Sequence, residues 1–235
     1  MERCKLAIII PAYNEDKTID KLIKQVINFG VPIVIDDGSK DFTAEISLKA
    51  GAKVVSHKIN MGYDEAINTG FRFACEYNFQ YILTIDADGQ HKSEYINEYI
   101  NLLSKGTDCI VGIRKNRQRL AEYIVSFYGI LFWEIDDPLC GMKAYNLDRY
   151  LGLKNSYIKK QIGMQFLIYA IKNNLIISQV NINENNRIDK PRFGSRFSSN
   201  YSILRTLLSI VFDDLLLLVK STKKYLIRSN LFKKI

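Results

Sequence analysis

Short apolar runs alternate with amphipathic stretches over the first half of this 235-residue chain. The runs read "KLAIII" from residue 5, "VPIVID" from 31, "AKVVSH" from 52 and "YILTID" from 81. The stretch after the first run, which Gly30 closes, has apolar residues at helical spacing: Ile19, Leu22, Ile23, Val26 and Ile27. Parallel strands need a crossover, usually a helix, between them. The alternation therefore predicts an α/β fold, with a mostly parallel sheet flanked by helices.

A basic, amphipathic segment over residues 198–235 follows a predicted domain over residues 1–197. Its apolar residues recur at threes and fours: Leu204, Leu208, Val211, Leu215 and Leu218. A membrane span needs roughly 20 apolar residues in a row, and Arg205, Asp213 and Asp214 interrupt this one. We therefore expect an amphipathic helix. It either lies in a membrane interface, with its terminal Lys and Arg near headgroups, or packs on the domain or on a second subunit.

Polar clusters follow three of the predicted strands at the point where each strand ends. They read "PAYNE" from residue 11, "DDGS" from 36 and "DADGQ" from 86. Ligands of open α/β sheets bind outside the carboxyl ends of the strands, so these loops predict one shared site. The sequence contains neither the G-x-G-x-x-G pattern of dinucleotide-binding folds after its first strand nor a P-loop.

Asp86 and Asp88 lie one residue apart and, on an extended backbone, face the same side. Like charges this close repel each other unless a cation lies between them. Oxygen ligands favour Mg²⁺ or Mn²⁺ over zinc, and the four cysteines form no CxxC pair. We therefore expect a divalent metal here. The alternative, that one acid caps the following helix, accounts for only one of the two.

Charge is divided unevenly along the chain. Residues 1–110 carry 12 Lys and Arg against 16 Asp and Glu, whereas residues 111–235 carry 21 against 9. The second half should therefore attract anions such as phosphates, acidic lipid or nucleic acid. The N-terminus lacks the features of a signal peptide, so we expect an intracellular protein with reduced thiols.

Six segments stand in one order over residues 6–145: "IIIPAYNE", "VIDDGSKDFT", "NMGYDEAINTGF", "TIDADGQH", "IVGIR" and "DPLCGMKAY". In this order they resemble the family 2 glycosyltransferases of GT-A fold, in the branch that contains dolichyl-phosphate mannose synthase and bacterial polyprenyl-phosphate glycosyltransferases. The resemblance implies a Rossmann-like GT-A domain. It also implies an inverting, metal-dependent transfer of a sugar from a nucleotide diphosphate sugar.

The resemblance assigns roles to individual positions. The donor-binding residues would be Pro11, Tyr13, Glu15, Ile35, Asp37, Asp86, Ala87, Arg114, Arg192 and Arg196. Among them, Asp37 would accept a hydrogen bond from the base, whether uracil or guanine, and Arg114 would contact the diphosphate. Gln90 would join Asp86 and Asp88 as a metal ligand, with Asp88 also catalytic.

Other positions receive structural roles. We expect Asp36 and Gly38 to form a turn, and His91 to shape the loop after the acids. Asn60, Gly62, Ala66 and Gly70 would serve helix entry and close helix packing.

Asp137 precedes a proline in a segment that, in the relatives, lies near the acceptor. In relatives that glycosylate a hydroxyl, this acid would be the catalytic general base. A lipid phosphate is already ionised and needs no base, and Asp137 would then orient groups or balance Lys143. The alternative is an aspartate that only forms a turn.

The chain departs from the family pattern in two places. "RIDKPRFGSRF" resembles the basic loop R-x-x-G-E-S-K, but Ser195 follows Gly194 directly, and the expected lysine is either shifted or replaced by Arg196. The candidates in this loop are Arg187, Lys190, Arg192 and Arg196. Gln165 lies where many relatives carry an acid.

Three functions are compatible with these features. The favoured one transfers sugar from a GDP- or UDP-sugar to a polyprenyl phosphate of dolichyl or undecaprenyl type, by a cytoplasmic enzyme in peripheral contact with the inner face of the membrane. The second uses a saccharide hydroxyl in cell-surface polysaccharide synthesis. The third is a non-catalytic basic module that binds membrane or nucleic acid, and the paired acids argue against it. We expect no nucleic-acid partner, and a homo-oligomer is compatible with the sequence.

Overall fold

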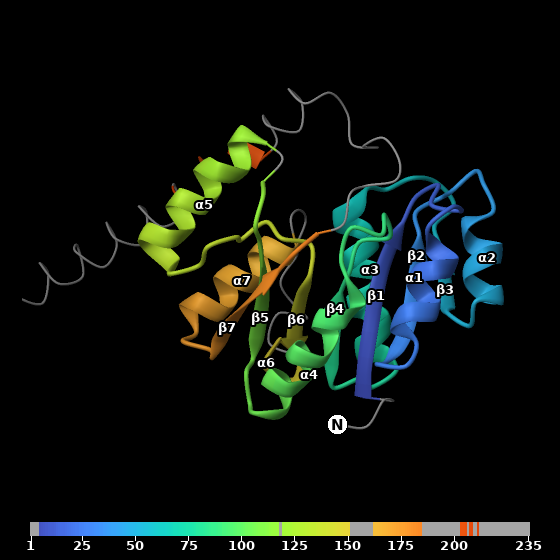
Figure 1. Cartoon of the computed structure of the whole chain (residues 1–235), viewed down its shortest axis with the longest axis horizontal. Helices are drawn as coiled ribbons and strands as arrows, with labels where there is room; N and C mark the ends of the chain where they lie inside the picture. Colours follow the sequence, from blue (N-terminus) through green and yellow to red (C-terminus); the bar gives the residue numbers. More distant parts are fainter. Residues whose placement is uncertain are drawn as a thin grey trace, which may run out of the picture.

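A seven-stranded sheet organises the part of the chain that the computed structural model describes, which is residues 5–117, 119–150, 162–184, 203–205, 207, 208 and 211. The strand order is β3-β2-β1-β4-β6-β5-β7 (Figure 1). The strands are β1 (Leu6–Ala12), β2 (Val31–Asp36), β3 (Lys53–Ser56), β4 (Tyr81–Thr84), β5 (Cys109–Arg114), β6 (Lys143–Asn146) and β7 (Ile177–Ile182). The helices are α1 (Ile19–Val26), α2 (Thr43–Lys49), α3 (Tyr63–Glu76), α4 (Ile96–Ser104), α5 (Leu120–Trp133), α6 (Leu147–Tyr150) and α7 (Ile162–Lys172), with a 3₁₀ turn η2 (Ser93–Tyr95).

Parallel pairing dominates, and this confirms the predicted α/β class. β6 is the exception, since it runs antiparallel to both β4 and β5. The sequence pattern does not predict a strand over these four residues. β6 brings the segment before it, including Gly141, back to the end of β4.

Both faces of the sheet are covered. Along β1, Leu6, Ile8 and Ile10 pack with α1 and α4 on one face, whereas Ala7 and Ile9 pack with α3 and α7 on the other. A strand buried on both faces reads as a continuous apolar run rather than as an alternation. The unbroken "LAIII" therefore specifies the centre of the sheet.

The first strand extends beyond its predicted end at Pro11. Pro11 pairs with Ile35 of β2, and β1 continues to Ala12. The carbonyl of Ile9 accepts a hydrogen bond from Ile85 N, and Ile9 is the last residue of β1 that pairs with β4. Pro11, two residues further on, faces the same side, where pairing with β4 has stopped. Its missing N–H therefore removes no ladder hydrogen bond.

The predicted C-terminal helix falls mostly outside the described residues. Residues 203–205, 207, 208 and 211 are helical, and Leu207 and Val211 pack in a cluster with Val125 of α5 and Met164 of α7. Within the described residues, no helix is both long and apolar enough to cross a membrane.

Helix α3 approaches the sheet closely through Gly70, as expected from the sequence. A Cβ built on Gly70 would lie 2.3 Å from Ile9 Cγ2, and Ile9 itself is fully buried. Neighbours that cannot move turn even one extra methyl group into overpacking.

We predict that Gly70→Ala destabilises the protein by about 1–3 kcal/mol, although alanine is intrinsically the better helix residue. Gly163→Ala is the matched control, because its Cβ would meet nothing nearer than 3.7 Å. Urea unfolding of both variants measures the effect. Equal stability of the two variants would show that α3 can move away from the sheet.

Candidate active site

The loops after β1 and β2 are joined by hydrogen bonds. Asn14 N donates to Ser39 Oγ at 2.9 Å, and Lys40 N donates to Asn14 Oδ1 at 2.8 Å. Glu15 N donates to Thr43 Oγ1 at 2.7 Å. Because β1 and β2 are parallel neighbours, their carboxyl ends meet at one edge, as predicted. Within this region Pro11 and Glu15 are buried and Tyr13 is half-buried.

Asp37 links this edge to the start of α3. Its Oδ1 accepts a hydrogen bond from Met61 N at 2.8 Å and its Oδ2 accepts one from Gly62 N at 2.7 Å. His57 Nδ1 lies 2.7 Å from Asp37 Oδ1, and His57 Nε2 lies 2.9 Å from Thr69 Oγ1. A carboxylate offers about four acceptor positions, and these contacts use three of them. The contact with the base stays a prediction.

The expected turn roles of Asp36 and Gly38 are confirmed. Asp36 Oδ1 accepts a hydrogen bond from Ser39 N at 3.1 Å, and Gly38 has a φ of 73°. A Cβ at Gly38 would also lie 2.7 Å from the backbone of Ile59. Gly62, at φ 94°, begins α3 as expected.

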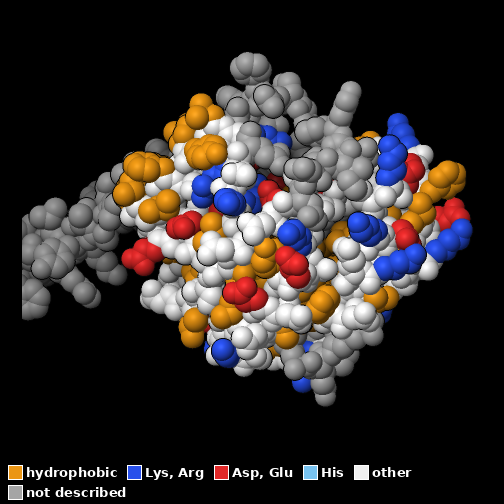
Figure 2. Space-filling view, viewed as in Figure 1, with side chains coloured by type: hydrophobic (Ala, Val, Ile, Leu, Met, Phe, Trp, Pro, Cys, Tyr) orange, Lys and Arg blue, Asp and Glu red, His pale blue; other side chains and the backbone are white. Residues whose placement is uncertain are grey.

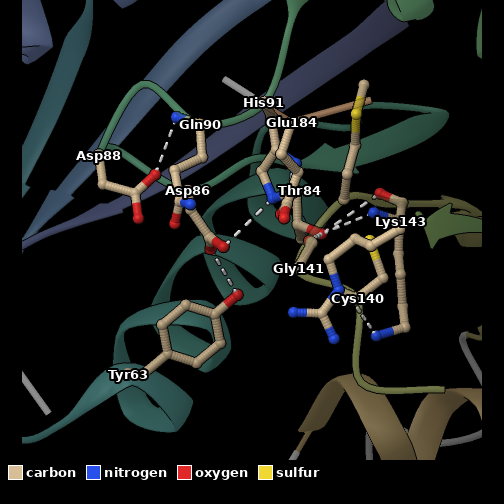
Figure 3. A network of polar contacts seen from close by, with 12 residues as sticks. Tyr63, Thr84, Asp86, Asp88, Gln90, His91, Cys140, Gly141, Lys143 and Glu184 are labelled. Atoms are coloured by element: carbon tan, nitrogen blue, oxygen red, sulfur yellow. Dashed lines mark hydrogen bonds and ion pairs between the residues drawn. The ribbon is translucent and has the colours of Figure 1, made fainter. Parts of the chain in front are cut away.

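Asp86 follows β4 and is held from two sides (Figure 3). Tyr63 Oη donates to its Oδ1 at 3.0 Å, and His91 Nε2 lies 3.3 Å from its Oδ2. Burial alone would raise the pKa of Asp86, but the hydrogen bonds and charge of His91, with the Tyr63 hydroxyl, outweigh it and lower that pKa. Asp86 therefore stays ionised at neutral pH.

Gly141 gives the Asp86 carboxylate its space. A Cβ on Gly141 would lie 2.3 Å from Asp86 Oδ2. The hydroxyl of Thr84 donates to the Gly141 carbonyl at 2.7 Å, which fixes this segment against the end of β4. A side chain at this position would therefore displace the Asp86 carboxylate.

Asp88 and Gln90 lie on the same loop as Asp86, and Figure 3 shows all three side chains projecting from it. Gln90 N donates to Asp88 Oδ1 at 3.0 Å, which orients that carboxylate. Among the described residues, no group of three or more His, Cys, Asp and Glu side chains is arranged to hold a metal ion. The available donor set is two carboxylates and the Gln90 amide oxygen. These are the hard oxygen donors that Mg²⁺ and Mn²⁺ prefer, so the residues fit such an ion.

His91 contacts Asp86 and supports the loop that carries the two acids, as predicted. Its side chain is only 2% exposed, and its Nδ1 lies 3.9 Å from Glu184 Oε1, just after β7. Nδ1 is buried and has no hydrogen-bond partner among the described residues. Burial would lower the pKa of His91, but its contact with Asp86 outweighs burial and raises that pKa. The contact with Asp86 therefore favours the protonated form of His91.

Arg114, at the end of β5, pairs with Asp137 in forked geometry. Arg114 Nε donates to Asp137 Oδ2 at 2.7 Å and Nη2 donates to Oδ1 at 3.0 Å, while the Arg114 amide donates to Oδ2 at 3.1 Å. Glu122 Oε2 lies 3.5 Å from Arg114 Nη2, and Glu122 also pairs with Arg119. Burial would raise the pKa of Asp137, but Arg114 outweighs it and holds that pKa below its usual range. Arg114, the residue predicted to bind the diphosphate, is therefore paired with Asp137, the predicted general base.

The side chains of Ile35 and Ala87 are buried in the two core clusters, and their roles at the site stay predictions. Gln165 is exposed on α7. The basic-loop candidates Arg187, Lys190, Arg192 and Arg196 lie outside the described residues, and their roles stay predictions.

Sequence reasoning missed Tyr63, Glu122, Gly141 and Glu184. A signal existed for Glu122, because it is the only charged residue between positions 120 and 133. A signal existed for Gly141 in its place after "DPLC". Nothing in the sequence pattern points to Tyr63 or Glu184, since their contacts depend on how distant strands pair.

We predict that Asp137→Asn destabilises the protein by about 3 kcal/mol, because it leaves the buried Arg114 without its forked carboxylate. The neighbouring Asp136→Asn, at an exposed position, is the control and should change stability by less than about 0.5 kcal/mol. Urea unfolding at pH 7 measures both.

The pH dependence has a definite sign. A carboxyl whose pKa is lowered by folding stabilises fully above its unfolded pKa of about 3.9 and loses that contribution as the pH falls through the lowered value. The stability gap between wild type and Asp137→Asn should therefore narrow in acid. A gap that is independent of pH between 7 and 3 would contradict the ion-pair account.

Comparison with known proteins bears on this site. The family model described as "Glycosyl transferase family 2" matches residues 7–138. An uncharacterized protein of Methanocaldococcus jannaschii is 30% identical over 197 residues, which cover 76% of this chain and 80% of that protein. The undecaprenyl-phosphate 4-deoxy-4-formamido-L-arabinose transferase of Salmonella paratyphi B is 33% identical over 127 residues, which cover 48% of this chain and 38% of that protein.

Solved structures share the fold. Glucosyl-3-phosphoglycerate synthase from Mycobacterium tuberculosis, crystallised with Mn²⁺, UDP and glucosyl-3-phosphoglycerate, superposes with a TM-score of 0.69. It is 20% identical, and the match covers 88% of this chain and 79% of that one. The same synthase has been crystallised with Mg²⁺ and UDP, with a TM-score of 0.66 and 20% identity. At this identity the likeness shows a GT-A type Rossmann-like fold.

Proposed function

The chain belongs to glycosyl transferase family 2 and is a glycosyltransferase, and we propose that it moves a sugar from a nucleotide diphosphate sugar to a polyprenyl phosphate at a membrane surface. The observation that carries the choice of acceptor is the forked ion pair between Arg114 and Asp137. The named transferase relative from Salmonella, which acts with undecaprenyl phosphate, supports the same class of acceptor.

The donor side rests on the loops of β1, β2 and β4. We propose that the edge formed by Tyr13, Glu15 and Asp37 takes the nucleotide, and that Asp86, Asp88 and Gln90 hold Mg²⁺ or Mn²⁺ beside the diphosphate. When bound, such an ion supplies positive charge to the departing diphosphate. Neighbouring structures with Mn²⁺ or Mg²⁺ and UDP support a divalent ion and a UDP-sugar.

The residues of the chain prepare this edge in advance. Tyr63 and His91 fix the Asp86 carboxylate, and the backbone N–H of Gln90 fixes the Asp88 carboxylate. Ligands that are already oriented lose less conformational entropy on binding. The low pKa of Asp86 keeps it anionic without the ion, so no proton has to leave when the donor arrives.

Asp137 is poorly suited to act as the general base for a hydroxyl acceptor. A general base works best when its pKa lies near the working pH, whereas Arg114 holds the pKa of Asp137 below its usual range. A phosphate oxygen carries its own negative charge at neutral pH and attacks without losing a proton. We infer that Asp137 fixes Arg114 rather than accepting a proton, and that a single displacement by the phosphate inverts the anomeric centre.

Lipid extraction tests the acceptor. The purified protein would be incubated with Mn²⁺, a radiolabelled UDP- or GDP-sugar and, in separate reactions, undecaprenyl phosphate, undecaprenol or an oligosaccharide acceptor. We expect label in the organic phase with the phosphate only, in a product that mild acid cleaves. Label that enters a saccharide acceptor and no lipid would overturn the proposed acceptor while leaving the glycosyltransferase assignment intact.

We predict that Asp88→Asn lowers turnover by at least about 100-fold, since one carboxylate ligand is lost. Glu94→Gln, which neutralises an exposed acid nearby, is the matched control and should keep full activity. Mn²⁺ affinity, measured by electron paramagnetic resonance, should fall in the first variant and not in the second. Normal Mn²⁺ binding by Asp88→Asn, with a normal circular dichroism spectrum, would refute the ligand assignment.

A further inference from the structure

Helix α5 exposes its large apolar side chains instead of burying them against the protein core. The buried residues of α5 are Ala121, Glu122, Val125, Ser126 and Gly129. Its exposed residues are Leu120, Tyr123, Ile124, Phe127, Ile130, Leu131 and Phe132, with Leu120 72% and Phe127 66% exposed. Surface helices normally place the apolar stripe inward. Folding of the described chain therefore does not explain this stripe, which we call the α5 apolar face.

The α5 apolar face is large and uncharged. Seven partly exposed side chains of this size present on the order of 700 Å² of apolar surface, above the roughly 300–600 Å² of the largest patch on a typical monomer. Between positions 120 and 133 the only charge is Glu122, which is buried and paired with Arg119. Figure 2 shows these apolar side chains gathered over α5. Protein interfaces of this size also carry several hydrogen bonds, and the face offers only the Tyr123 hydroxyl as a side-chain group.

Basic residues border the face at its N-terminal end. Lys115 is exposed, and Arg117 and Arg119 are partly exposed in the segment that leads from β5 into α5. Arg117 also lies over the ring of Tyr123, at 5.6 Å from its centroid. Figure 2 shows Lys and Arg side chains beside the apolar group. An apolar helix face bordered by cations matches an anionic bilayer, in which headgroups pair with the cations and acyl chains take up the apolar side chains.

The face lies at the same edge of the sheet as the site. Arg114, directly before the basic segment, pairs with Asp137, which follows α5 by four residues. Gly141, four residues later, touches Asp86. Figure 1 shows α5 beyond the end of β5, away from the N-terminus of β1. A surface that contacts α5 is therefore brought close to Asp86 and Asp88, to which we assign the metal ion and the donor diphosphate.

We propose that the α5 apolar face docks on an anionic lipid bilayer, with Lys115, Arg117 and Arg119 against the headgroups. This deepens the proposed function, because a docked α5 brings a lipid-borne phosphate to the site edge. The docking itself requires neither a donor nor an acceptor lipid.

Vesicle sedimentation tests the proposal on the full chain. Sucrose-loaded vesicles of phosphatidylcholine and phosphatidylglycerol at 3:1 would be compared with phosphatidylcholine alone, both without polyprenyl phosphate. We expect wild type to bind the anionic vesicles, and Phe127→Glu/Leu131→Glu to weaken binding by roughly tenfold or more. The charge-matched control is Phe42→Glu/Leu48→Glu, which changes two exposed apolar residues at α2 and should bind within about twofold of wild type.

Further outcomes separate the alternatives. Circular dichroism and thermal unfolding would show that both variants fold, as expected for exposed positions. Equal vesicle binding by wild type and the α5 variant would overturn the proposal, as would no binding by wild type. If light scattering instead shows a wild-type dimer that the α5 substitutions dissociate, with vesicle binding unchanged, the face is a contact between two copies. Because the vesicles contain no acceptor, failure of glycosyl transfer to lipid phosphate leaves this result unaffected.

Discussion

A guanidinium and a carboxylate, both almost shut off from water, pair where β5 ends. Arg114 and Asp137 are 10% and 1% exposed. Their forked contact closes a loop in which the chain leaves the sheet, forms α5 and returns, so the position of α5 depends on it. The same contact sets the start of the segment that carries Gly141 to Asp86 and then becomes β6. Removing either partner would leave an uncompensated buried charge, which costs far more than a surface ion pair contributes.

The two halves of the edge handle charge in different ways. On the donor half, Asp37 and Asp86 are held by backbone amides, histidines and a tyrosine hydroxyl. These groups orient a carboxylate without fully cancelling its charge, which leaves the edge able to attract a cation. On the other half, Asp137 is neutralised by Arg114, and Glu122 is shared between Arg114 and Arg119. The excess of positive charge in the second half of the sequence therefore includes arginines that are used internally.

The sequence predicts most of the fold because the patterns that specify these helices and strands are local in the chain. Each predicted feature lies within a few residues of the sequence. The apolar run of β1 and the helical spacing in α1 follow from periodicity, and the acids after β4 follow directly on the strand that precedes them. β6 was missed because four residues give no periodicity, and its antiparallel direction depends on both neighbours. Pairing of Arg114 with Asp137, and the contact between Gly141 and Asp86, depend on the return path of the chain after α5. The apolar residues between positions 120 and 132 recur at helical spacing and do form α5, but spacing alone does not tell which side of a helix meets the protein.

The features of the second half favour one kind of acceptor for a common physical reason. Arg114 holds the pKa of Asp137 below its usual range, so this carboxylate is poorly suited to take a proton. That suits the proposed acceptor, because a phosphate brings its own negative charge. An uncharged helix face at the same edge gains free energy when it is removed from water, as it would be in a bilayer. A polyprenyl phosphate combines the two properties, since its headgroup is an anion and its tail resides in a bilayer. A water-soluble saccharide has neither property, because its hydroxyl must lose a proton and it carries no apolar tail.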